Sequence, residues 1–261
     1  MALYSLAAVY RGKTIISIKS CLSPVRGIIK DMAKYPIFLE VSGRRVVLIG
    51  GGAIAARKAE PLLKAGARLV VVAERTGEAM RELCRGTTAG STGSTSSPQV
   101  SSPQAEMIEG RYSKDYLSGA MLAIAATDDD KLNQRIYKDC QELEILCNVV
   151  DSPVLCDFFV PAVVKRGDLQ IAICTEGHSP AYAGHIRKKI EKIFTEKHGE
   201  FLAELEAIRE HIIEEVTDPA ERKALSGKLV DDTSFEYFVA NGVALWRRRA
   251  EEMIKSHTGK Q

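Results

Sequence analysis

A glycine-rich turn between an apolar strand and a helix constrains the fold of this chain more than any other feature. Residues 46–49 read Val-Val-Leu-Ile, an uninterrupted apolar run typical of a strand buried on both faces of a parallel sheet. Gly50, Gly52 and Ala55 follow in the spacing G-x-G-x-x-[G/A]. The first glycine permits a tight turn, the second lets a pyrophosphate approach the backbone, and a small third residue lets helix and strand pack closely. A second apolar strand, residues 68–73, follows the helix, and this order predicts a Rossmann-like α/β domain with a parallel sheet.

The residue after the second strand indicates which nucleotide the turn binds. Glu74 stands about 20 residues beyond the glycines, where a carboxylate accepts hydrogen bonds from an adenosine ribose 2′-OH and repels a 2′-phosphate. The sequence therefore predicts NAD rather than NADP as the cofactor. Arg75 weakens this prediction, because a guanidinium can accommodate a phosphate, and an ordinary solvated strand end is the alternative reading of Glu74.

Polar side chains also follow the later strands of the expected sheet. Thr127 and three aspartates come directly after one strand, and Asp151 comes directly after another that contains Asn148. Open α/β sheets bind ligands at these carboxyl ends, although at least one of the three aspartates is expected to cap the next helix. From the residues alone, Asp151 is either a catalytic carboxylate or the N-cap of a turn that begins at Ser152. The expected elements are strands at residues 107–112, 121–126 and 145–150 and a helix at residues 131–142.

Composition excludes several classes of protein. Among 261 residues, Lys+Arg number 36 and Asp+Glu 34, and the formal charge of +2 gives no general electrostatic reason to bind nucleic acid. The cysteines form no CxxC pair and are interpreted as free thiols, which suits a reducing interior. No apolar run approaches the roughly 18 residues that a membrane span needs. We therefore expect a soluble, cytoplasmic protein.

Segments of unusual composition suggest how the chain is divided. Residues 1–31 are basic and are expected to be a poorly ordered leader, either a targeting segment or an extended start. The nucleotide-binding domain is expected at residues 32–147, interrupted at residues 86–105 by an uncharged stretch that cannot offset its ordering entropy and should be a disordered insertion. A small α+β segment, residues 148–192, follows. Residues 193–261 show apolar residues at three- and four-residue spacing among dense charge, which predicts a helical C-terminal domain.

Four motifs occur together in this order. They are the glycine turn with Arg57-Lys58, an Ala-Thr-Asp-Asp run from Ala126, Asn-Val-Val-Asp ending at Asp151, and a Gly-x-Ser-Pro turn before a basic helix. In combination they resemble the precorrin-2 dehydrogenase and sirohydrochlorin ferrochelatase module of sirohaem synthesis. The resemblance covers roughly everything from residue 34 to the C-terminal helices, apart from the insertion.

The resemblance implies an NAD-dependent oxidation of precorrin-2 to sirohydrochlorin by a homodimer joined through the central segment. It makes Asp151 the catalytic carboxylate and places Asn148 and Thr175 in the substrate region, where Thr175 replaces a family serine but keeps a hydroxyl. With the residues derived from the turn and the strands, the expected NAD contacts are Gly50, Gly52, Ala53, Ile54, Glu74, Arg75 and Thr127. The residues leave open whether the protein also inserts Fe²⁺ as a second substrate. Other readings are a dehydrogenase without chelatase activity and a non-catalytic NAD-binding regulatory module.

A tetrapyrrole carries many carboxylates, so cationic side chains are expected near it. His178 and His185 would lie two turns apart on a helix, too far for one ion, and no preformed metal site is predicted. Cys156 and Cys174 are interpreted as buried small residues. The candidate cations are Lys165, Arg166, Arg187, Lys188 and Lys189.

Overall fold

The structure is a computed structural model that describes residues 7–10, 13–16, 34–86 and 104–258. It divides into two units, Met1–Leu39 and Glu40–Gln261. In the first unit, β1 (Ala7–Tyr10) and β2 (Lys13–Ile16) form an antiparallel pair. These strands fall inside the leader expected at residues 1–31, whose other residues lie outside the described part of the chain.

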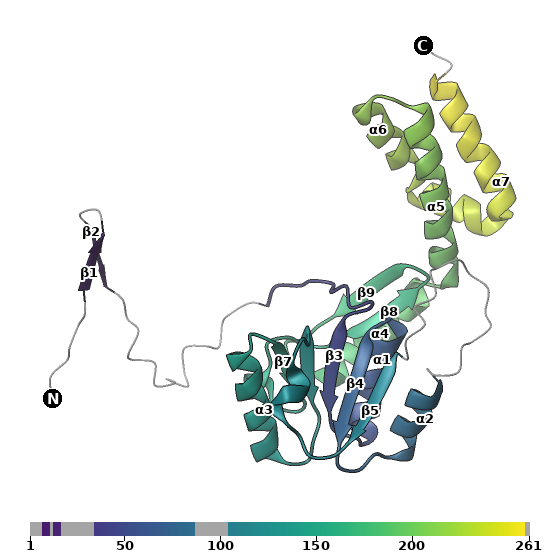
Figure 1. Cartoon of the computed structure of the whole chain (residues 1–261). Helices are drawn as coiled ribbons and strands as arrows, with labels where there is room; N and C mark the ends of the chain where they lie inside the picture. Colours follow the sequence, from purple (N-terminus) through teal and green to yellow (C-terminus); the bar gives the residue numbers. More distant parts are fainter. Residues whose placement is uncertain (1–6, 11–12, 17–33, 87–103, 259–261) are drawn as a thin grey trace. The chain divides into compact units, whose positions relative to one another are not determined.

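The second unit contains a five-stranded parallel sheet in the order β5-β4-β3-β6-β7 (Figure 1). The chain builds β3, β4 and β5 outward in one direction and then returns to add β6 and β7 beside β3. This reversal places a topological switch point between β3 and β6, where doubly wound sheets bind ligands at the carboxyl ends of the strands. The predicted Rossmann-like domain is confirmed. The strands are β3 (Arg45–Ile49), β4 (Arg68–Ala73), β5 (Ala105–Glu109), β6 (Leu122–Ala125) and β7 (Leu146–Val149).

Alternating side chains of β3 explain why helices cover both faces of the sheet. Val46 and Leu48 belong to a core that also contains buried residues of α1 (Ala53–Lys64) and α2 (Glu78–Gly86). Val47 and Ile49 belong to a separate core. That second core includes residues of α3 (Asp130–Glu142). The apolar residues 46–49 of β3 are therefore buried from both sides, as their sequence predicts.

Local signals define the start of α3 and the edge of the sheet. The Asp129 carboxylate accepts hydrogen bonds from the backbone N–H of Lys131 at 2.9 Å and of Leu132 at 3.1 Å, so one of the three aspartates after β6 is the helix cap, as expected.

Residues 87–103 of the expected insertion lie outside the described residues, but Ala105 is buried and opens β5. β5 thus begins and ends earlier than the predicted strand at residues 107–112.

After β7 the chain forms a hairpin and a helix. The short η3 (Pro153–Leu155) leads to the antiparallel pair β8 (Ala162–Arg166) and β9 (Leu169–Ile173), and α4 (Pro180–Ile193) follows. Another short helix, η2 (Lys114–Leu117), precedes β6.

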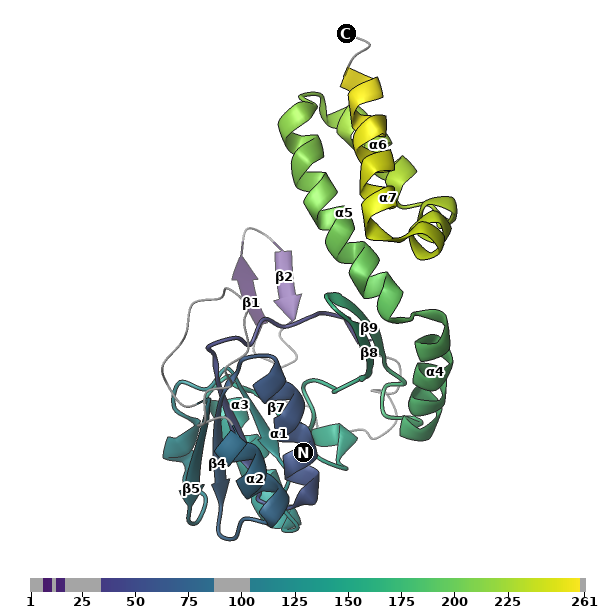
Figure 2. The ribbon, with the colours of Figure 1, turned by 90° about the vertical axis from the view of Figure 1, so that its right-hand side faces the viewer.

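The C-terminal part is helical, as predicted. Figures 1 and 2 both show α5, α6 and α7 side by side, and their contact is a third apolar core centred on Phe201, Phe238 and Trp246. Gly242, at a φ of 78°, interrupts α7. No described helix is long and apolar enough to cross a membrane. The helices are α5 (Glu196–Glu215), α6 (Pro219–Leu229) and α7 (Asp232–Thr258).

Candidate active site

The three glycines of the turn have different structural roles. Gly50 has a φ of 126°, and a Cβ there would lie 2.2 Å from the carbonyl oxygen of Ala126. A Cβ on Gly51 would lie 2.3 Å from the carbonyl oxygen of Arg75. Backbone packing alone therefore requires glycine at both positions. Gly52 has an ordinary φ of −80°, and no heavy atom of the described residues lies within 4 Å of a Cβ built on it. The absence of a side chain at Gly52 leaves open space rather than relieving a clash.

This open space lies at the N-terminus of α1, where it suits the pyrophosphate of a dinucleotide. Gly52 is the N-cap of α1 and provides no side-chain cap, and the first turn carries no acidic residue. The backbone N–H groups of that turn and the positive end of the helix dipole are thus available to an anion. Ala53 and Ile54 are exposed, as contacts with a cofactor require, while Ala55 is fully buried and brings the helix close to the sheet. The residues present fit a bound NAD.

The adenosine end of the expected nucleotide site lies after β4. Glu74 and Arg75 are exposed there. Glu74 forms an ion pair with Arg111 at 3.5 Å, but the two side chains are 68% and 91% exposed, so solvent screens the pair and the carboxylate can still accept hydrogen bonds from a ribose.

Thr127 is placed differently from the other expected NAD contacts. Its hydroxyl donates a hydrogen bond to Oδ1 of Asn133 at 2.8 Å, and the Asn133 amide donates to the Thr127 carbonyl at 3.0 Å. Asn133 is buried in α3. Thr127 follows Ala126, whose carbonyl packs on Gly50, so Thr127 lies next to the glycine turn. Its hydroxyl proton is already donated to Asn133.

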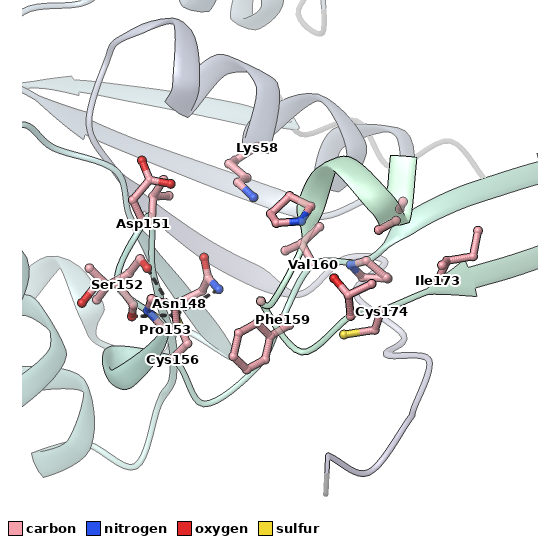
Figure 3. Close-up of a pocket in the computed structure, with 18 residues that line it drawn as sticks. Lys58, Asn148, Asp151, Ser152, Pro153, Cys156, Phe159, Val160, Ile173 and Cys174 are labelled. Carbon is pink, nitrogen blue, oxygen red and sulfur yellow. Dashed lines mark hydrogen bonds between the residues drawn. The ribbon is translucent and has the colours of Figure 1, made fainter. Parts of the chain in front are cut away.

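A cavity of about 450 Å³ adjoins the carboxyl end of β7 and brings together Asn148, Asp151 and Thr175 (Figure 3). These residues come from β7, from the loop after it and from the segment before α4. α1 contributes Lys58 to the same cavity. The volume falls in the range of roughly 300–1,000 Å³ that small-molecule sites occupy. The candidate substrate residues, far apart in sequence, therefore line one site.

Asp151 lines this cavity from the loop that follows β7. Its φ of 59° is in the left-handed region, which Asp tolerates better than most residues. The N-cap of η3 is Ser152, and among the described residues the Asp151 side chain makes no hydrogen bond or ion pair. The structure therefore does not support the alternative in which Asp151 caps the following turn.

Two side chains close the loop that carries Asp151. The Asn148 amide donates to the carbonyl of Phe158 at 2.8 Å and to the Cys156 sulfur at 3.4 Å. The Asp157 carboxylate accepts from the backbone N–H of Cys147 at 2.8 Å, and the Asp157 N–H donates to the Cys147 carbonyl at 2.8 Å. Asn148 therefore lines the cavity and also holds the loop. Asp157 was not identified from the sequence, because its partner is ten residues away and no local motif marks the contact.

Lys58 is the cation of the cavity that the candidate list omitted. No residue of that list lines the cavity. The Arg166 guanidinium donates to the Phe194 carbonyl at 2.8 Å, and Arg187 is paired with Glu191. The other three candidates are exposed. The Arg57-Lys58 pair in the motif after the glycine turn was the available signal, but the sequence does not show which face of α1 meets the cavity.

The described cysteines are free, as expected, and differ in burial. Cys140 and Cys147 are fully buried, and a hydrogen bond with Cys140, together with burial, raises the pKa of the Cys147 thiol. Cys156 is half-buried and Cys174 is exposed, and both line the cavity. The expectation that Cys174 is buried is therefore wrong, because it follows β9 at the cavity rather than entering a core. The described residues contain no cluster of three or more His, Cys, Asp or Glu side chains able to hold a metal.

The nucleotide turn and the sheet define the chain as a protein with an NAD(P)-binding domain. Residues 37–162 match the family model described as "Putative NAD(P)-binding", and residues 166–193 match the model "Sirohaem biosynthesis protein central".

Comparison with full-length relatives identifies the family. A precorrin-2 dehydrogenase of Methanosarcina barkeri is 35% identical over 85% of this chain and 94% of its own length. The chain belongs to the precorrin-2 dehydrogenase family. A siroheme synthase of Photorhabdus laumondii is also 35% identical, over 79% of this chain but only 40% of its own length. The chain thus spans less than half of that relative.

A solved structure agrees with the fold. The structure titled "SirC, precorrin-2 dehydrogenase" superposes with a TM-score of 0.65, covering 85% of this chain and all of that one, at 22% identity. At that identity the likeness concerns the fold alone.

Proposed function

We propose that this protein oxidises precorrin-2 to sirohydrochlorin with NAD⁺ as the acceptor. The observation that carries the proposal is the placement of a free carboxylate, Asp151, in a cavity that shares helix α1 with the open nucleotide turn at Gly52. A dehydrogenation needs a nucleotide and a proton acceptor at one site, and α1 links the two. The family relationship supplies the identity of the substrate.

The reaction removes a hydride and a proton from the macrocycle. NAD⁺ supplies the hydride acceptor when it is bound at the turn. Asp151 takes the proton, because it is the one acidic residue among the described residues that line the cavity. No described donor forms a hydrogen bond or ion pair with its carboxylate. Asn148 and Asp157 hold the loop, so the carboxylate keeps one position relative to the substrate.

The direct test is anaerobic incubation of the purified protein with precorrin-2 and NAD⁺. We expect NADH and the sirohydrochlorin spectrum to appear together and at equal rates. Asp151→Asn removes the proton acceptor and should lower kcat by roughly 10²- to 10⁴-fold, the usual contribution of a general base. Asp168→Asn changes an exposed carboxylate in the β8–β9 turn that does not line the cavity and is the matched control. Precorrin-2 left unchanged by a protein that binds NAD⁺ would refute the proposal.

Insertion of Fe²⁺ into sirohydrochlorin would use the same cavity. It releases pyrrole protons, and Asp151 is the carboxylate placed to accept them. We propose this as a second reaction of the site. Its test is the rate of sirohaem formation from sirohydrochlorin and Fe²⁺ with the wild-type protein, with Asp151→Asn and with no protein. Equal rates in all three would exclude it.

We also propose that two copies associate through the segment of β8, β9 and α4. Large apolar side chains of this segment are exposed, with Val163 at 40%, Tyr182 at 58% and Ile193 at 64%. Covering such side chains is a common driving force for a symmetric dimer. Sedimentation analysis should give a dimer that Ile193→Lys dissociates, while Val230→Lys, at an equally apolar exposed position on the helical part, should not change the mass. A wild-type monomer at micromolar concentration would contradict this proposal.

A further inference from the structure

The cavity at Asp151 contains one cationic side chain. Among the 18 described residues that line it, Lys58 is the only Lys or Arg. Figure 3 shows Lys58 projecting from α1 with its ammonium end turned into the cavity, across from the loop that carries Asp151. A single cation and a single carboxylate thus form the charged lining of this site.

Lys58 has no counter-ion within the described part of the chain. It is half-buried, yet no carboxylate lies within ion-pair distance of it. Lys64, on the same helix, pairs with Glu60 at 2.7 Å. Removing an ammonium partly from water is unfavourable unless an anion compensates it. The free Lys58 ammonium is therefore suited to an anionic group that arrives with a ligand.

The expected ligand is anionic, and the other charged residue of the lining does not favour it. Asp151 repels a carboxylate, and most other lining groups are apolar or neutral. The N-terminus of α4 borders the cavity through Pro180 and Ala183 and adds a weak positive potential. Only Lys58 supplies a full positive charge to offset Asp151.

We propose that Lys58 binds a side-chain carboxylate of the tetrapyrrole substrate. The inference rests on the proposed function and extends it by naming the residue that recognises the substrate's charge. Gly52 and Lys58 are six residues apart, or about 9 Å along a helix. One rigid helix then holds the nucleotide at its first turn and the macrocycle at its second.

The test separates binding of the two ligands. An octacarboxylate porphyrin, titrated by its fluorescence without nucleotide, probes carboxylate recognition, and the KM values for precorrin-2 and NAD⁺ are measured separately. Lys58→Met should weaken porphyrin binding and raise the KM for precorrin-2 by about 10- to 100-fold, the usual loss for one charge-assisted hydrogen bond. The KM for NAD⁺ should stay within about twofold. Lys58→Arg, which keeps the charge, should recover most of the binding.

Lys64→Met is the matched control, because it makes the same change on the same helix outside the cavity. Thermal unfolding of all variants should stay close to the wild type, since neither Lys58 nor Lys64 is fully buried. Porphyrin binding by Lys58→Met equal to wild type would overturn the inference. So would a rise confined to the KM for NAD⁺, which would make Lys58 a phosphate ligand. If the wild-type protein binds porphyrin through Lys58 but does not oxidise precorrin-2, the proposed function fails and the carboxylate site stands.

Discussion

Replacing Gly52 by alanine should separate nucleotide binding from folding. The new methyl group would meet no described atom within 4 Å, and a φ of −80° suits alanine. The expected cost in the free energy of unfolding is at most about 1 kcal/mol, the typical value for the loss of a favourable helix cap. The methyl group would instead occupy the space through which a pyrophosphate reaches the backbone N–H groups of α1. Loss of one such contact, worth about 1.5–3 kcal/mol, should weaken NAD⁺ binding roughly 10- to 100-fold.

Gly51→Ala, in contrast to Gly52→Ala, should lower the stability of the fold, and it is therefore the comparison variant. Its methyl group would lie 2.3 Å from the Arg75 carbonyl oxygen and 2.9 Å from the Ala73 Cβ, so the backbone must move. Such overpacking costs about 1–3 kcal/mol. At about 2–4 °C per kcal/mol for a chain of this size, Gly51→Ala should lower the Tm by about 2–12 °C.

Calorimetric titration with NAD⁺ and thermal unfolding by circular dichroism measure the two quantities on the same samples. Gly52→Ala should keep the wild-type Tm within about 4 °C and the wild-type KM for precorrin-2 within about twofold. Unchanged NAD⁺ affinity in Gly52→Ala would show that the pyrophosphate does not pass this residue. A Tm of Gly51→Ala equal to wild type would show that the turn is looser than its packing indicates.

Three further substitutions test other parts of the argument. Glu74→Gln removes the charge that repels a 2′-phosphate, so the preference for NAD⁺ over NADP⁺ should fall at least about 10-fold. This preference is the ratio of the two kcat/KM values, and an unchanged ratio would exclude Glu74 from the site. Asp157→Ala removes the side-chain acceptor of the Cys147 N–H and frees the loop that carries Asp151, so kcat should fall roughly 10-fold with the KM for NAD⁺ constant. A normal kcat would contradict the role of Asp157 in holding this loop. Burial and the hydrogen bond from Tyr112 to Asp139, at 2.9 Å, raise the pKa of the Tyr112 phenol above 10.0. The contribution of the protonated phenol to stability is therefore complete below pH 10.0 and is lost as the pH rises further. Tyr112→Phe should cost about 1 kcal/mol at neutral pH and flatten the alkaline decline in urea denaturation, and a decline as steep as in the wild type would refute this.

The parts of the fold that local sequence determines were predictable. The apolar run of β3, the glycine turn and the acidic cap of α3 each depend on a few neighbouring residues. The position of β5 was predicted wrongly at both ends, because Ala105 was assigned to the insertion and Tyr112 to the strand. In the structure its side chain packs beside α3, where it donates to Asp139, so its burial depends on tertiary contact.

The site was predictable where a motif ends a strand and not where it depends on helix orientation. Asp151, expected as the catalytic carboxylate, and Thr175, expected in the substrate region, both line one cavity. Lys58 was passed over in favour of more basic stretches, whose arginines prove to be engaged with backbone carbonyls and carboxylates of the chain itself. Which side of α1 faces a ligand is decided by the burial of Ala55 and Ala59, and this becomes clear only when the helix is packed on the sheet.

The helical core described above determines what tryptophan emission can report. The chain has one tryptophan, Trp246, which is 1% exposed, donates to the Ser234 hydroxyl at 2.9 Å and packs against Phe201 and Phe238. No residue of this core belongs to the two cores of the sheet. Emission at tryptophan wavelengths therefore follows the melting of α5, α6 and α7, whereas circular dichroism averages over the whole chain. A mismatch between the two transition midpoints would measure how far the tail and the nucleotide-binding part unfold independently.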